Sequence, residues 1–186
     1  GIFHFTVVEV GWLLGIPILS GSIFRLPIGI LTDKYGGKYI FTGLLLLCSI
    51  PLYLLTFANS FWSFAILSFF FGLVGTSFAV GIGFTSIWYP KEWQGRALGI
   101  FGMGNAGAAI TTFIAPTLLN RFSESDPENG WKLLPIIYAA VIFAIGLAFL
   151  FFTKNKKVES QGKTTAQLLS PLKNIRVWRF GAYYFL

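Results

Sequence analysis

Charged residues are scarce in this 186-residue sequence, where Asp, Glu, Lys and Arg together make up only 11%. Soluble domains carry about a quarter charged residues. Hydrophobic residues reach 55% and aromatic residues 18%, and several long stretches hold no charge at all. This composition excludes an ordinary soluble domain and indicates an integral membrane protein whose surroundings are the lipid bilayer.

Cysteine and histidine are nearly missing too, with one of each, Cys48 and His4. One cysteine cannot form an internal disulfide, and the two residues cannot supply a soft-metal ligand set, so we expect no metal and no cofactor. No nucleophile–base pair occurs in the apolar stretches, which argues against an enzyme. The net charge of +7 comes from residues that flank these stretches and form no continuous basic face, so it does not indicate a nucleic-acid partner.

Five apolar stretches are long enough to cross a bilayer as helices, at about residues 10–31, 39–57, 61–89, 97–119 and 133–152. A sixth begins after Pro171 and stops with the sequence. We therefore expect an all-α membrane protein with five complete transmembrane helices and a truncated sixth. Its parts would be a bundle at 1–152 that lacks its first helix, a linker at 153–171, and the start of a second bundle at 172–186.

The distribution of Lys and Arg predicts the orientation in the membrane. Most of these residues fall in or next to the connections 32–38, 90–96 and 153–171, whereas the opposite side holds only Arg121 and Lys132. The three Lys-rich and Arg-rich connections are therefore predicted to be cytoplasmic, in a multi-pass protein of the inner (plasma) membrane.

Arg25 is unusual because it lies inside the first apolar stretch, six residues before Leu31 at its predicted cytoplasmic end. A guanidinium there costs at least about 3 kcal/mol on insertion scales, and it stays protonated. The side chain could bind an anion, or it could extend to the membrane interface. We favour an anion because charges inside membrane spans rarely lack a role.

Residues 29–38, Gly-Ile-Leu-Thr-Asp-Lys-Tyr-Gly-Gly-Lys, resemble the G-x-x-x-D-[RK]-x-G-[RG]-[RK] signature of the major facilitator superfamily. Gly36 and Gly37 permit positive φ, and Gly29 permits close helix approach. The alternative is an ordinary basic turn. In that family this loop helps to latch the cytoplasmic gate, so the resemblance implies gating residues, namely Asp33, Gly29, Lys34 and Gly37.

Small residues three or four apart in the fourth stretch predict close packing against another helix, and they are Gly95, Gly99 and Gly102. The third stretch offers a matching face made of Gly72, Gly75, Ala79 and Gly83. Asn105 adds an amide that can donate hydrogen bonds to an anion. Its glycine neighbours leave backbone open to a small ligand.

Residues 88–99, followed by Gly104-Asn105-Ala106-Gly107, resemble the nitrate signature of the nitrate/nitrite porter family (NarK/NasA type) within the major facilitator superfamily. The run Arg25-Leu26-Pro27-Ile28-Gly29 is similar to that family's second transmembrane helix. The resemblance implies helices two to six and the start of helix seven. It also implies a set of nitrate or nitrite ligands: Arg25, Asn105, Phe78, Tyr184, Gly104 and Gly107.

The resemblance further implies alternating access, in which two bundles rock about a central site where Arg25 grips a flat anion. No Asp, Glu or His lies in the interior of a complete predicted span. This favours nitrate/nitrite exchange over proton symport and leaves protons open as a coupling ion. The alternatives are a facilitator of another small solute and a membrane scaffold without transport.

Overall fold

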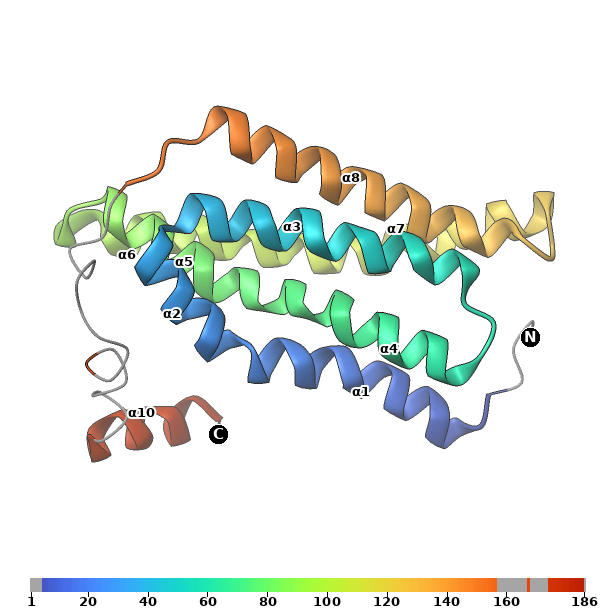
Figure 1. The fold of residues 1–186 in the computed structure, drawn as a ribbon, viewed down its shortest axis with the longest axis horizontal. Coiled ribbons are helices and arrows are strands. Elements are labelled where there is room, and N and C mark those ends of the chain that lie inside the picture. The colour runs from blue at the N-terminus through green and yellow to red at the C-terminus, as the bar shows by residue number, and fades with distance from the viewer. Residues whose placement is uncertain (1–4, 157–166, 168–173, 186) are drawn as a thin grey trace.

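The computed structural model describes residues 5–156, 167 and 174–185, and the regular elements in these ranges are all helices. Five of its helical segments are long and apolar enough to cross a membrane: Val7–Tyr35, Gly37–Phe57, Phe61–Trp88, Lys91–Ser125 and Gly130–Phe152. They run back and forth along one axis (Figure 1). The prediction of an all-α protein with five spans is confirmed.

Three of the five spans consist of two helices each. Span one contains α1 (Val7–Ile23) and α2 (Arg25–Tyr35). Span three contains α4 (Phe61–Gly72), the 3-10 turn η2 (Leu73–Thr76) and α5 (Ser77–Trp88). Span four contains α6 (Lys91–Gly102), the 3-10 turn η3 (Met103–Asn105) and α7 (Ala106–Ser125). The remaining elements are α3 (Gly37–Leu54), η1 (Leu55–Phe57), α8 (Gly130–Phe152) and α10 (Ile175–Phe185).

Side-chain caps fix two of the helix starts that the sequence suggests. The Thr6 hydroxyl accepts a hydrogen bond from the Glu9 backbone N–H at 3.3 Å, and the Glu9 carboxylate accepts one from the Thr6 N–H at 2.8 Å. This reciprocal pair is a capping box that begins α1. At the start of α4 the Ser60 hydroxyl accepts from the Ser63 N–H at 3.3 Å. Each cap thereby gives a partner to a backbone N–H group at the start of its helix.

Two of the predicted loops are mostly helical, so those loop predictions are wrong. In residues 32–38 only Gly36 is outside a helix, since α2 ends at Tyr35 and α3 begins at Gly37. In residues 90–96, helix α6 begins at Lys91, directly after its N-cap Pro90. Span four also continues to residue 125, beyond its predicted end at 119. The apolar stretches reflect composition alone, whereas the helices continue into the polar residues that flank them.

Spans one and three make a close contact through their glycines. A Cβ added to Gly72 would overlap the Ser20 side chain and the Pro17 backbone, and one added to Gly21 would lie 2.7 Å from the Gly72 carbonyl oxygen. The glycine face of span three therefore meets span one, and its predicted pairing with the glycines of span four is wrong. A Cβ would meet nothing within 4 Å at Gly95, Gly99 or Gly102.

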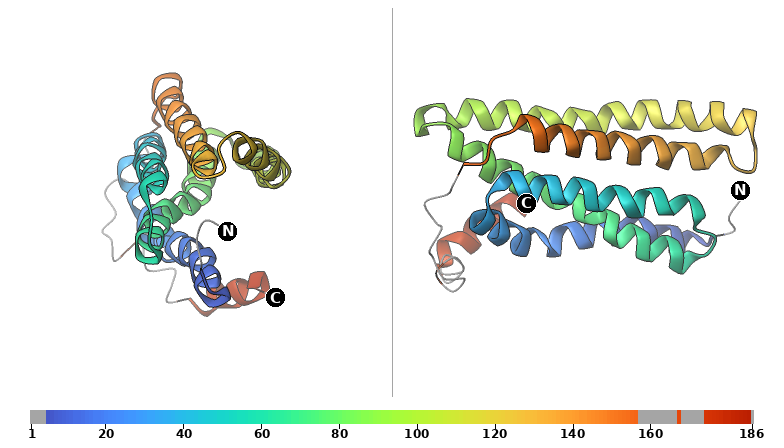
Figure 2. Two further views of the ribbon diagram at one scale, coloured as in Figure 1. Left: turned by 90° about the vertical axis from the view of Figure 1, so that its right-hand side faces the viewer. Right: turned by 45° about the horizontal axis from the view of Figure 1, so that its top comes forward.

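The bundle has its centre at α3, which packs along α8 on one side and against α4 and α5 on the other (Figure 2). The Phe41 and Phe149 rings lie 4.8 Å apart at the α3–α8 contact. Cys48 and Val80 are fully buried. Span four has no residue buried by the described parts of the chain. It stands at the side of the bundle, and this leaves its inner face available to line a cavity.

Residues 153–156, which we call the end strap, tie together the end of the bundle where α2, α5 and α8 finish. The Lys156 ammonium donates to the Ile87 carbonyl at 2.7 Å and lies 5.5 Å from the Trp88 ring centroid. The Asn155 amide covers Gly36 and donates a long hydrogen bond, 3.5 Å, to the Tyr35 carbonyl. Both carbonyls belong to last helical turns, where carbonyls lack a partner in their own helix. The rest of the predicted linker, apart from residue 167, lies outside the described residues.

Candidate functional site

The three helix breaks have local causes in the sequence. Pro27 has no N–H to donate to the Ile23 carbonyl, and its ring crowds that carbonyl, so α1 ends there and Arg25 becomes the first residue of α2. Residues 72–76 and 102–105 each contain two glycines, which are poor helix formers. The 3-10 turns η2 and η3 fall in these runs, and such turns inside longer helices often mark functional hinges.

A cavity of about 640 Å³ lies beside these breaks. It is lined by Arg25, Phe41, Gly75, Ser77, Phe78, Phe101, Gly104 and Asn105. Four of the predicted substrate ligands, Arg25, Phe78, Gly104 and Asn105, thus meet here from three different spans. The lining combines a guanidinium, an amide and a hydroxyl with aromatic rings. This combination suits a small anion that has a flat face.

Arg25 extends across to span three, where its Nη2 donates to the Gly75 carbonyl at 3.5 Å, the long limit for such a bond. Among the described residues no carboxylate pairs with it. The proposed transport cycle needs Arg25 to be buried around the anion; within the described residues the side chain is exposed, and its burial in the whole protein stays a prediction. Its charge lies within a transmembrane span, faces the cavity and has no acidic partner among the residues that the structure describes.

Two aromatic rings form one wall of the cavity. The Phe78 and Phe101 centroids lie 5.5 Å apart with their planes tilted by 36°. Phe101 fits against span three at Gly81, where an added Cβ would overlap its ring. Gly81 is therefore the residue that lets spans three and four approach and hold the wall in place. The sequence pattern of glycines four apart does not include it.

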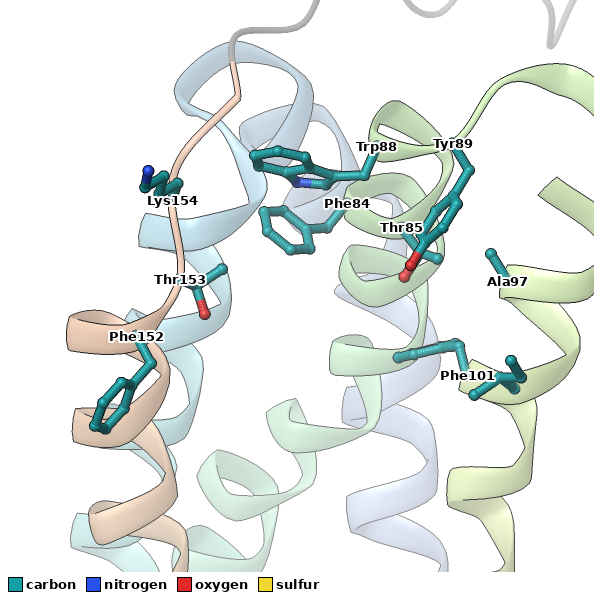
Figure 3. Close-up of a pocket in the computed structure, with 10 residues that line it drawn as sticks. Phe84, Thr85, Trp88, Tyr89, Ala97, Phe101, Phe152, Thr153 and Lys154 are labelled. Carbon is teal, nitrogen blue, oxygen red and sulfur yellow. The ribbon is translucent and has the colours of Figure 1, made fainter. Parts of the chain in front are cut away.

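A larger cavity of about 720 Å³ lies at the ends of α5, α6 and α8, and Phe101 belongs to its lining as well. Figure 3 shows that Phe84, Trp88, Tyr89 and Phe152 surround it with aromatic rings. Lys154 supplies the one charged group in its lining. Among the described residues, none of the predicted substrate ligands lines this cavity, so the candidate anion site is the cavity beside Arg25.

Two of the predicted substrate ligands are not part of that cavity in the described structure. Gly107 is the second residue of α7, does not line the cavity, and would accept a Cβ with nothing within 4 Å. Tyr184 belongs to α10, but its side chain lies outside the described residues. Both remain predictions that rest on the family resemblance.

The predicted gating residues lie close to the α2–α3 connection, at the end of the bundle that the end strap crosses. Asp33 is half-buried in the last turn of α2, and the Lys34 ammonium lies 5.5 Å from the Tyr35 ring centroid. A Cβ on Gly29 would meet nothing within 4 Å, so its predicted role in close helix approach is wrong. That role falls to Gly37, where a Cβ would lie 2.6 Å from the Phe84 ring. Gly37 does not have the positive φ that its sequence position suggests.

The sequence did not predict Ser77, Gly75, Phe41 and Phe101 as residues of the cavity. Ser77 and Gly75 belong to the run Gly75-Thr76-Ser77-Phe78, next to the predicted ligand Phe78. A polar run inside an apolar span was the signal that could have identified them. Phe101 carried no signal, since aromatic residues are abundant throughout the chain.

The Major Facilitator Superfamily model matches residues 1–185. The chain belongs to the major facilitator superfamily. This facilitator chain is 40% identical over 188 residues to the probable nitrate/nitrite antiporter NarK1 of Thermus thermophilus, covering 98% of this chain and 42% of that protein. It is 30% identical to the nitrite extrusion protein of Bacillus subtilis (strain 168), over 98% of this chain and 45% of that protein.

A third relative of this facilitator chain is the probable nitrate transporter NarT of Staphylococcus carnosus (strain TM300). It is 33% identical over 95% of this chain and 44% of its own length. The chain thus spans less than half the length of these three relatives. No solved structure gives a significant match.

Proposed function

We propose that the whole protein is a secondary transporter that moves nitrate, nitrite or both across the cytoplasmic membrane by alternating access, with the anion gripped by Arg25. The observation that carries this proposal is a guanidinium inside a transmembrane span that faces a polar cavity and has no carboxylate partner in the described part of the chain. An uncompensated cation in lipid favours a bound anion as its counter-ion. The names of the similar proteins support nitrate and nitrite as that anion.

The groups around the cavity suit a planar, singly charged oxyanion. A guanidinium presents parallel N–H donors that match two oxygens of such an ion, and it loses its hydration more readily than an ammonium does. The Asn105 amide can donate to a further oxygen. The Phe78 and Phe101 rings offer flat surfaces that exclude water from the faces of the ion. Bound anion would neutralise Arg25 and allow a second bundle to close over the site.

The orientation and the coupling belong to the same proposal. Residues 32–38, 90–96 and 153–156 lie at one end of the bundle (Figure 1), and the Lys and Arg concentrated there favour a cytoplasmic position. Asp33, Lys34 and Gly37 at this end would help to hold the cytoplasmic gate. The acidic residues in the described spans lie near helix ends and away from Arg25. This favours exchange of one anion for another over proton symport.

Substituting Arg25 by Lys tests this proposal, because the charge is kept while the fork of donors is lost. In proteoliposomes that hold the whole protein, we expect the nitrate and nitrite flux of Arg25→Lys to fall about tenfold or more. Arg121→Lys, near the end of span four, serves as the control and should transport normally. Flux with and without an imposed pH gradient distinguishes exchange from proton symport. Near-normal flux through Arg25→Lys would refute the proposed grip on the anion.

A further inference from the structure

The hydroxyl of Ser77 differs from most other hydroxyls in the spans. Most of them donate back to a carbonyl of their own helix, three or four residues earlier. The neighbouring Thr76 follows this pattern, with its hydroxyl 2.7 Å from the Leu73 carbonyl, and it is fully buried. The Ser77 hydroxyl makes no hydrogen bond within the described residues, although the residue is half-buried. An unpaired hydroxyl in a membrane span costs free energy unless it gains a partner.

The position of Ser77 indicates what that partner is. Ser77 is the first residue of α5, directly after η2, and it lines the same cavity as Arg25 and Asn105. The Arg25 guanidinium contacts the carbonyl of Gly75, two residues before Ser77. The side-chain amide of Asn105, which lines the same cavity from span four, likewise makes no hydrogen bond within the described residues. The cavity wall thus holds one charged donor, one amide and one hydroxyl, each from a different span.

We propose that Ser77 is a further anion-binding residue, whose hydroxyl donates a hydrogen bond to an oxygen of the oxyanion held by Arg25. This inference rests on the proposed function of the same cavity. Arginine provides the attraction for negative charge, and Ser77 and Asn105 provide neutral donors to the remaining oxygens. The three donors come from α2, α5 and η3, so the bound ion links three spans of the bundle at their breaks.

The test measures nitrate affinity by calorimetry on the whole protein in detergent, with Ser77→Ala, Ser77→Cys and Ser77→Thr. A hydrogen bond to a charged partner is strong enough that losing it weakens binding about tenfold or more. We expect that loss for Ala and for Cys, whose thiol is a weak donor of similar size. Thr keeps the hydroxyl and should bind nitrate within about threefold of the wild-type affinity.

Ser86→Ala is the matched control. Ser86 lies on the same helix and is also half-buried, but its hydroxyl donates to the Ile82 carbonyl at 2.7 Å. We expect Ser86→Ala to bind nitrate normally. If Ser77→Ala and Ser77→Cys also bind normally while Arg25→Ala has lost binding, the role of Ser77 is refuted and the proposed function stands. If the wild-type protein binds neither nitrate nor nitrite, the proposed function fails, and this inference fails with it.

Discussion

Replacing Gly72 by Ala is a sharp test of how this bundle is held together. A Cβ at Gly72 would lie 2.5 Å from the Pro17 carbonyl oxygen, and closer still to the Pro17 Cα and the Ser20 hydroxyl. Non-bonded carbon atoms separate to about 3.5–4.0 Å, so α1 and α4 would have to move apart by about 1 Å. Backbone atoms form much of the contact, so a change of side-chain rotamer cannot relieve it.

The size of the effect follows from two opposing terms. Overpacking of a tight contact costs up to about 3 kcal/mol, and we expect the upper part of this range because the obstacle is backbone. Ala gains about 1 kcal/mol over Gly in a helix interior. The net loss of stability for Gly72→Ala is therefore about 2 kcal/mol. At about 2–4 °C per kcal/mol for a bundle of this size, its melting temperature falls by about 4–8 °C.

Thermal unfolding of the purified protein in detergent measures this loss, with Gly43→Ala as the control. Gly43 lies in the interior of α3, and a Cβ there would meet nothing within 4 Å. Gly43→Ala should keep or slightly raise the melting temperature. Because the α1–α4 contact sets the distance between Arg25 and the Gly75 carbonyl, Gly72→Ala should also weaken nitrate binding. Equal melting temperatures for the two variants would refute the close packing of spans one and three.

Three further predictions concern the aromatic wall, the α2–α3 connection and the turn between α7 and α8. Gly81→Val should displace the Phe101 ring, lower stability by about 1–3 kcal/mol and reduce nitrate affinity measured by calorimetry. Unchanged nitrate affinity would show that the Phe78–Phe101 wall takes no part in binding the anion. Gly36→Ala should lose about 1–3 kcal/mol because φ is +93° and the Asn155 amide fills the space for a Cβ, and thermal unfolding checks this. Asp126 accepts hydrogen bonds from the main-chain N–H groups three and two residues further on, which hold the pKa of its carboxyl below the ordinary 3.8. Because the pKa of this carboxyl is lower in the folded than in the unfolded protein, the stability that its two hydrogen bonds contribute is complete at neutral pH and is lost as the pH falls through the folded pKa. Hydrogen-exchange protection of those two amides should therefore be constant from pH 8 to about 5 and fall below about pH 4.

The spans and two of their starts could be predicted from the sequence because they depend on local properties. Twenty or so apolar residues define a span, and Thr6 with Glu9 defines a helix start through one reciprocal pair of hydrogen bonds. The break at Arg25 could have been derived in the same way, since Pro27 removes a single donor. Such features need no knowledge of which helices become neighbours.

The contacts between spans could not be predicted, because spacing identifies a small face but not its partner. The glycines of span three meet Pro17 and Ser20 of span one, and those of span four face open space. The exposure of Arg25 depends on how many helices surround it, which its sequence position does not reveal. Ser77 is a candidate because it lines the cavity and its hydroxyl makes no bond to its own helix, which depends on side-chain geometry that sequence spacing does not determine.

The end strap changes how force travels through the five helices. Without it, α8 would leave the bundle as a free tail, held only by its packing against α3 and α7. Asn155 and Lys156 instead donate hydrogen bonds to the last turns of α2 and α5, so the segment that follows α8 is attached to both of these helices. A force applied after residue 156 is then shared by α2, α5 and α8, and it does not act on α8 alone. In the proposed alternating access, these three helices would therefore move together.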